Sequence, residues 1–122
     1  MTDIKKKMRI LIIDDNPGFL ESTHMALSKI GFDCHNSRTV EQAQELLQEE
    51  KFDLIICNYF MPECNGREAL KKLGDSDPEC KLILTSTYPL DVKFKKTDRF
   101  IFVDKLGLVD WLSEKYSEVL YV

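Results

Sequence analysis

Residues 52–62 read FDLIICNYFMP, and this stretch decides the fold of the chain. A short apolar run over residues 54–57 stops at the polar Asn58. A Met-Pro pair follows, and it cannot continue a sheet ladder because proline has no N–H group to donate. Such a run between polar and turn residues is typical of a buried strand, predicted here over Leu54–Asn58. Asn58 is therefore expected at the carboxyl end of that strand.

A second apolar run ends in the same way. Residues 9–13 read RILII, the acids Asp14 and Asp15 follow, and the next two residues are an Asn-Pro pair typical of a helix start. In open parallel α/β sheets, the carboxyl ends of the strands face one crevice, in which ligands bind. Asp14, Asp15 and Asn58 are therefore expected to converge there.

The remaining sequence alternates between strand and helix patterns. Helical spacing of apolar residues, N-cap residues and short apolar runs are the signals. They predict further strands over residues 32–36, 82–85 and 100–103, and helices over Pro17–Ile30, from Thr39, from Asn65 to near Gly74 and from Leu108 to the chain end. The pattern decays over residues 86–99, which leaves at most a short fourth helix. This order predicts an α/β fold with a five-stranded parallel sheet and helices on both faces.

Composition places limits on the kind of protein. The chain has 122 residues, 43% hydrophobic and 31% charged, with a net charge of −4. We expect one domain over residues 1–122, with a core over about 8–120 and no effector domain. The acidic balance argues against nucleic-acid binding. No apolar stretch reaches about 18 residues and no signal peptide is visible, so we expect a cytoplasmic protein that does not contact membranes.

The four cysteines are Cys34, Cys57, Cys64 and Cys80. They form no C-x-x-C pair, and two histidines accompany them, a pattern that argues against structural zinc. Reduced, mostly buried thiols are the expectation in the cytoplasm.

The strand-end residues resemble a known family along essentially the whole chain: the CheY-like receiver domains of bacterial two-component response regulators. The motif positions of that family match Asp14, Asp15, Met61, Pro62, Gly66, Thr85, Phe102 and Lys105. The resemblance implies a flavodoxin-like, doubly wound sheet with strand order 2-1-3-4-5. It also implies histidine kinases, phosphotransfer proteins or downstream signalling proteins as partners.

The chemistry implied by the resemblance is phosphoryl transfer from a phosphohistidine to an aspartate, with one Mg²⁺ ion. Asp14, Asp15, residue 58 and the Phe60 backbone carbonyl would bind the metal, since Mg²⁺ prefers oxygen ligands. Lys105 and Thr85 would contact the phosphoryl group. Thr85 and Phe102 would act as the switch, although an aromatic residue in a strand is more often part of the core. The acid pair alone is also explained as a cap of the first helix.

At the phosphoacceptor position this sequence has Asn58. An amide is a poor nucleophile and cannot form an aspartyl phosphate, so we expect no catalytic residue and no enzyme activity. Mg²⁺ binding remains possible but weakened. Asn58 is either an engineered replacement of aspartate or a strand-end residue in a site that lost its chemistry; modification of Cys57 or Thr85 instead is a third alternative. Leu106 also departs from the family, which commonly has a cis-proline after the lysine.

The sequence thus favours a pseudo-receiver that works by binding proteins independently of phosphorylation, as a monomer or weak homodimer. The alternative is an ordinary receiver seen in an inactive Asp→Asn form. A Mg²⁺-dependent phosphotransferase or hydrolase with Asp14 or Asp15 as nucleophile is less favoured, since His24 and His35 lie off the strand ends. A flavodoxin-like cofactor binder is disfavoured because the first strand-helix turn lacks a glycine-rich loop.

Overall fold

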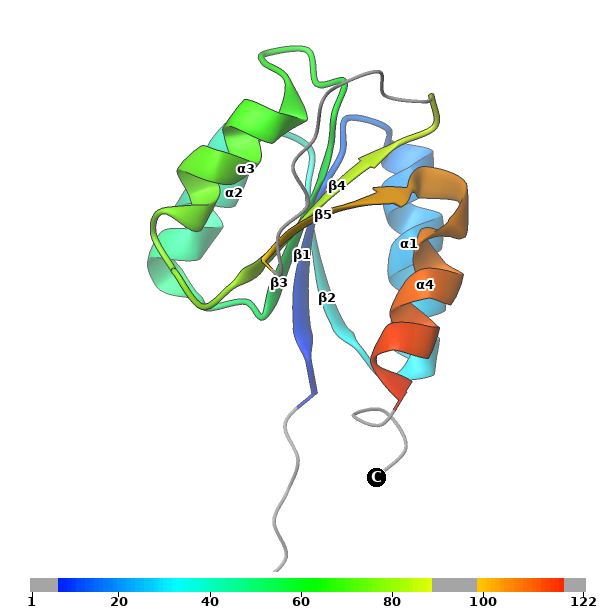
Figure 1. Cartoon of the computed structure of the whole chain (residues 1–122). Helices are drawn as coiled ribbons and strands as arrows, with labels where there is room; N and C mark the ends of the chain where they lie inside the picture. Colours follow the sequence, from blue (N-terminus) through cyan, green and yellow to red (C-terminus); the bar gives the residue numbers. More distant parts are fainter. Residues whose placement is uncertain (1–6, 89–98, 118–122) are drawn as a thin grey trace, which may run out of the picture.

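The computed structural model describes residues 7–88 and 99–117. Its five strands are all parallel and form one sheet in the order β2-β1-β3-β4-β5. The helices α1 and α4 cover one face of this sheet, and α2 and α3 cover the other (Figure 1). The elements are β1 (Arg9–Ile13), α1 (Pro17–Ile30), β2 (Asp33–Ser37), α2 (Val40–Glu49), β3 (Leu54–Asn58), α3 (Gly66–Gly74), β4 (Lys81–Ser86), β5 (Phe100–Asp104), the 3-10 turn η1 (Lys105–Gly107) and α4 (Leu108–Lys115). The predicted fold class and strand order are confirmed.

The sheet separates two hydrophobic cores because successive side chains of a strand point to opposite faces. In β1, Leu11 and Ile13 pack on the side of α2 and α3, whereas Ile10 and Ile12 pack on the side of α1 and α4. All five residues of β3 are buried, as expected for the central strand of a sheet covered on both faces. The central strands are therefore fixed in register, and so are the residues at their ends.

Three helices begin where the sequence predicted them, at asparagine or threonine caps. Asn16 accepts from the Phe19 N–H at 3.1 Å, Thr39 from the Gln42 N–H at 3.1 Å and Asn65 from the Glu68 N–H at 2.9 Å. Each bond satisfies an N–H group that has no partner within its own helix. These caps fix the first turns of α1, α2 and α3, which lie next to the carboxyl ends of the strands.

The boundaries differ from the sequence predictions by small amounts with clear causes. Strand β2 begins at Asp33 and not at Phe32, because the Phe32 N–H donates to the Leu27 carbonyl at 3.0 Å and so belongs to the end of α1. The last helix, predicted to run to the chain end, is observed as α4 up to Lys115 with a turn at Tyr116, and residues 118–122 of the prediction lie outside the described residues. Most of the predicted short fourth helix, residues 89–98, also lies outside them.

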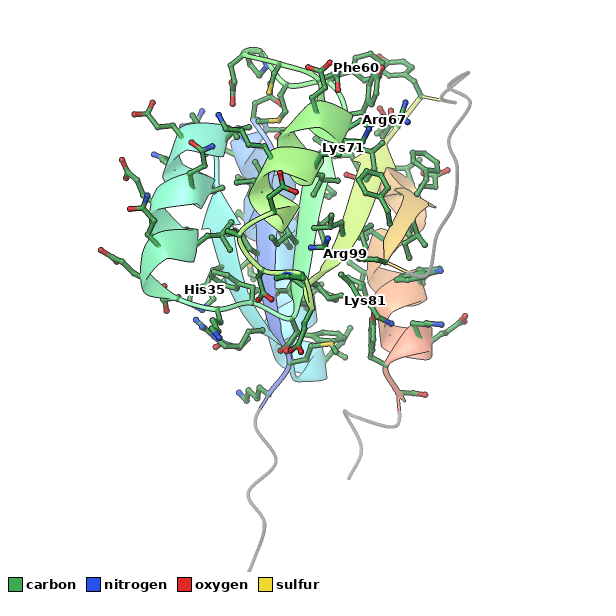
Figure 2. The ribbon with its side chains drawn as sticks, turned by 60° about the vertical axis from the view of Figure 1, so that its left-hand side comes forward. His35, Phe60, Arg67, Lys71, Lys81 and Arg99 are labelled. Atoms are coloured by element: carbon green, nitrogen blue, oxygen red, sulfur yellow. The ribbon has the colours of Figure 1, made fainter. Side chains whose placement is uncertain are left out.

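Arg99 fixes the start of the edge strand β5 to the preceding turn. Its guanidinium donates to the backbone carbonyls of Gly74 at 2.6 Å, Asp77 at 2.7 Å and Cys80 at 2.9 Å. The labelled side chain lies below α3 in Figure 2. One cation thereby satisfies three carbonyls of the α3–β4 connection, which anchors β5 beside β4.

A second arginine, Arg9, organises the same amino-terminal end of the sheet at β1. The Arg9 guanidinium pairs with Asp33 at 3.1 Å and Glu50 at 2.8 Å, and it lies over the Phe52 ring. His35 lies 3.1 Å from the same guanidinium, far from Phe60 in Figure 2. His35 therefore lies away from the carboxyl ends of the strands, as the sequence predicted. Within the described ranges, no helix has the length and apolar character needed to cross a membrane.

Candidate functional site

The carboxyl ends of the parallel strands bring the candidate residues to one edge of the sheet. Asn58 and Thr85 are direct neighbours in the β3–β4 register, and the Tyr59 N–H donates to the Thr85 carbonyl at 2.8 Å. Asp14 directly follows β1, and its N–H donates to the Ser37 carbonyl at 3.1 Å. The sheet therefore places Asp14 and Asn58 at one edge, as the strand-end argument predicted, with Thr85 beside Asn58.

Asp14 is buried and forms an ion pair with Lys105 at this edge. Its Oδ2 lies 2.6 Å from Lys105 Nζ, and its Oδ1 accepts from the Asn16 N–H at 2.9 Å. The Lys105 ammonium also lies 4.3 Å from the centre of the Phe19 ring. The Asp14 and Lys105 side chains are 1% and 10% exposed. Lys105 thus compensates the charge of a carboxylate that has lost its hydration. It does so from η1, which follows the edge strand β5.

Asp15 behaves differently from its neighbour. Its side chain is exposed and, within residues 7–88 and 99–117, it makes no hydrogen bond or ion pair. The structure therefore brings one of the two predicted carboxylates into the buried edge and leaves the other in water.

Asn58 is 7% exposed and satisfies its amide locally. Its Nδ2 donates to the Phe60 backbone carbonyl at 2.9 Å. This is the carbonyl that the family resemblance implies as a metal ligand. The neighbouring Thr85 hydroxyl donates to the Cys57 carbonyl at 3.5 Å. Both polar side chains thus bond to backbone atoms of β3 and the loop that follows it.

The loop between β3 and α3 is held against β3 by backbone contacts. Phe60 and Asn65 form an isolated antiparallel bridge, and the Gly66 N–H donates to the Tyr59 carbonyl at 2.7 Å. A Cβ atom on Gly66 would lie 2.1 Å from the Asn58 carbonyl oxygen, so no larger residue fits there without backbone movement. This close approach gives a physical reason for glycine at position 66, which the sequence analysis had only matched to a motif position of the family.

Glu63 adds a contact that sequence reasoning missed. Its Oε1 accepts from the Val40 N–H at 2.9 Å, so a side chain from the β3–α3 loop satisfies the first N–H group of α2. The two residues are 23 positions apart, and no periodicity or local motif pairs them. The contact depends on the packing of α2 beside α3 and could be found only from the fold.

Large exposed hydrophobic side chains gather around the same edge, and we call Phe60, Tyr88 and Leu106 the rim residues. Each lies two positions after the end of its strand, β3, β4 or β5, and they are 53%, 67% and 85% exposed. The Phe60 and Tyr88 rings meet edge to face with centroids 5.9 Å apart. The predicted switch residue Phe102 is 37% exposed on β5, so it is not part of the buried core.

Three of the four cysteines are buried, as predicted, and Cys64 is half-buried in the β3–α3 loop. Burial raises the pKa of Cys34 and of Cys80 to about 12, and it also raises the pKa of Cys57. The thiol is therefore the stable form of all three at neutral pH. Because the thiolate is the nucleophile, the oxidation or modification of Cys57 that the sequence left open is disfavoured.

These thiols give a pH dependence of stability. An unfolded cysteine ionises near pH ~8.5, whereas the buried ones stay protonated, so the unfolded state binds fewer protons above that pH. Their contribution to stability is complete below about pH 8.5 and is lost as the pH rises toward the folded pKa. Urea unfolding at about pH 8 and pH 10 should show a lower free energy of unfolding at the higher pH. The Cys34→Ala variant should show a smaller drop, and equal drops would contradict the assignment.

The fold and the strand-end residues define a doubly wound α/β domain of the receiver class. The family model described as "Response regulator receiver domain" matches residues 10–106, so the chain belongs to the response regulator receiver domain family.

Relatives and solved structures agree with this membership. The protein named "Probable transcriptional regulator ycf29" of Cyanophora paradoxa is 37% identical over 112 residues, which cover 90% of this chain and 50% of that protein. The response regulator TrrA of Thermotoga maritima, solved with Mg²⁺-BeF, is 27% identical with a TM-score of 0.76 over 93% of this chain and 99% of that one. TrrA in complex with the histidine kinase ThkA gives 25% identity and a TM-score of 0.77 over 93% and 98% of the chains. The chain spans half or less of the length of the first curated relatives.

Proposed function

We propose that this chain is a receiver domain of two-component signalling that binds protein partners without being phosphorylated itself. In this proposal Asn58 stands where the family has its phosphoacceptor aspartate. The observation that carries the proposal is the neutral Asn58 carboxamide at the end of β3, hydrogen-bonded to the Phe60 carbonyl. An amide is a poor nucleophile, and its lone pair is delocalised into the carbonyl group, so no acyl phosphate forms at this position.

The rim residues supply the surface for such partners. Aromatic side chains are enriched at binding hot spots, and Phe60 and Tyr88 are exposed beside each other at the sheet edge. Arg67 and Lys71 lie one turn apart on α3, and Figure 2 draws both below Phe60. TrrA forms a complex with the histidine kinase ThkA, and we propose a histidine kinase, a phosphotransfer protein or a downstream signalling protein as the partner here.

The roles of the remaining site residues follow from the same proposal. Lys105 and Thr85 keep the positions of phosphoryl-contacting groups, and Thr85 and Phe102 those of the switch, but no reaction passes through them. We propose that Mg²⁺ binding by Asp14, Asp15 and the Phe60 carbonyl is weakened by Asn58. The domain acts in the cytoplasm as a monomer or weak homodimer and is not an enzyme.

The alternative, an ordinary receiver in an inactive Asp→Asn form, is favoured by the retained neighbours of Asn58. The buried Asp14–Lys105 pair and the buried Thr85 are the groups that a phosphoryl site would need. In this alternative, an aspartate restored at position 58 would accept a phosphoryl group.

Incubation with a small-molecule phosphodonor and Mg²⁺, followed by intact-mass measurement, tests both candidates. We expect no phosphoryl group on the chain as given. We expect the Asn58→Asp variant to gain one phosphoryl group, because the carboxylate restores the nucleophile beside Lys105 and Thr85. A Thr85→Ala, Asn58→Asp double variant is the control, and it should be labelled more slowly because it lacks one hydrogen bond to the phosphoryl oxygens.

The outcomes separate the possibilities. Labelling of the chain as given would overturn the proposal. Labelling of the variant alone shows that Asn58 is the single block, which keeps the inactive-form alternative open. Labelling of neither shows that the site no longer supports the reaction, and protein binding is then the function that remains.

A further inference from the structure

We propose that the Asn58 carboxamide replaces a divalent cation at this sheet edge, so that the pocket holds its shape without Mg²⁺. The inference rests on the proposed function, since it assumes that Asn58 occupies the position of the phosphoacceptor. It goes further by assigning the amide nitrogen a structural task and by making the pocket independent of metal.

The first step is the contact between Asn58 and Phe60. The two atoms, Nδ2 and the backbone carbonyl oxygen, lie 2.9 Å apart, which is an ordinary hydrogen-bond distance for an amide donor. An aspartate in the same rotamer would place a carboxylate oxygen at this distance from the carbonyl oxygen. Two acceptors so close, with no proton between them, repel each other. In that rotamer an aspartate would be stabilised by a cation between the two oxygens, whereas the asparagine brings its own N–H group.

The second step is the charge balance of the buried edge. Lys105 Nζ lies 2.6 Å from Asp14 Oδ2 and compensates that carboxylate, while Asp15 is exposed and solvated. Asn58 adds no charge to the pocket. A third carboxylate at position 58 would leave a negative charge that no described cation neutralises, since Lys105 is already paired. The pocket is thus close to electrically balanced as it stands.

The third step is the fit of the donor set to Mg²⁺. This ion requires a near-octahedral set of oxygen ligands and rarely gives up its waters for neutral groups. Of the nominated ligands, the Phe60 carbonyl accepts from Asn58 and Asp14 Oδ2 is in contact with Lys105. A Mg²⁺ ion bound directly to both of these oxygens would therefore compete with the Asn58 amide and with the Lys105 ammonium, so the residues present favour the pocket without the metal.

The experiment compares thermal unfolding with EDTA and with Mg²⁺ for three proteins. The chain as given should have the same Tm in both conditions, within about 1 °C. The Asn58→Asp variant should have a lower Tm in EDTA, and Mg²⁺ should raise it by about 3 °C or more. The matched control is Asn36→Asp, because Asn36 also donates its Nδ2 to a backbone carbonyl, that of Leu20 at 3.2 Å, but lies on the exposed edge strand β2. This control should show no response to Mg²⁺.

Two results of the unfolding experiment would overturn the inference. One is a Tm of the chain as given that rises with Mg²⁺ as much as that of Asn58→Asp, and the other is an Asn58→Asp variant with no response to Mg²⁺. Titration of Mn²⁺ into the chain as given, followed by the electron paramagnetic resonance signal of free Mn²⁺, tests the inference without any variant; loss of that signal at one equivalent would also overturn it. Phosphoryl labelling of the chain as given would contradict the proposed function, whereas a metal response without labelling would contradict this inference alone.

Discussion

Replacing Gly66 with alanine is expected to lower the free energy of unfolding by about 3 kcal/mol. The added Cβ would lie 2.1 Å from the Asn58 carbonyl oxygen, 2.7 Å from the Asn58 carbonyl carbon and 2.9 Å from Tyr59 Cα. All three are backbone atoms, so no side-chain rotation relieves the contact. The variant has to shift either the end of β3 or the first turn of α3. Urea unfolding followed by circular dichroism measures the change.

Gly107→Ala is the matched control for this substitution. A Cβ on Gly107 would meet no atom within 4 Å, and its φ of −99° suits an L-residue. The control should leave stability unchanged or raise it by about 0.4–1 kcal/mol, because alanine restricts the unfolded chain. Equal losses in the two variants would show that the close packing on Asn58 is not the cause.

Replacing Asp14 with alanine is expected to cost about 3 kcal/mol or more. The substitution leaves the Lys105 ammonium, 10% exposed, without its partner at 2.6 Å, and it removes the acceptor of the Asn16 N–H group. The cost of an unpaired charge in a poorly hydrated place exceeds that of a lost surface contact. Chemical denaturation of the variant and of the chain as given measures the difference.

Asp15→Ala is the control, because Asp15 is the exposed neighbour of the same type. Its replacement should change stability by less than about 0.5 kcal/mol. Lys105→Met in the Asp14→Ala background should recover part of the loss, since the buried charge is then removed. An Asp14→Ala variant as stable as Asp15→Ala would contradict the buried ion pair.

The fold was predictable from the sequence because each strand carries its own apolar run and each early helix its own cap. Leu54–Asn58 was placed with its observed bounds, and Thr39 and Asn65 cap the helices that were predicted to begin there. The errors lie where a residue is shared by two elements. Phe32 has the apolar character of a strand residue, but its N–H group bonds to the end of α1. The local sequence pattern cannot show whether a backbone N–H group will bond to the end of a helix or to a neighbouring strand.

The sequence was enough to predict which residues lie at the candidate site, but not which of them form hydrogen bonds or ion pairs with each other. Strand ends placed Asp14, Asn58 and Thr85 at one edge because parallel strands share a direction. No sequence pattern indicated that Lys105 pairs with Asp14, or that the Asn58 amide bonds to the Phe60 carbonyl. Those contacts depend on rotamers and on charge compensation across residues distant in the chain. The exposure of the rim residues was also missed, because the sequence does not distinguish a hydrophobic loop residue that packs inward from one that faces water.

The hydrogen bond from the Val40 N–H to Glu63 joins the β3–α3 loop to the start of α2. Phe60, which partners would contact, belongs to the same loop and is bridged to Asn65. A partner that pulls this loop outward therefore also draws Glu63 away from Val40 and leaves the first turn of α2 without that acceptor. Under the proposed function, displacement of this loop would therefore couple the sheet edge to the first turn of α2 without any covalent change.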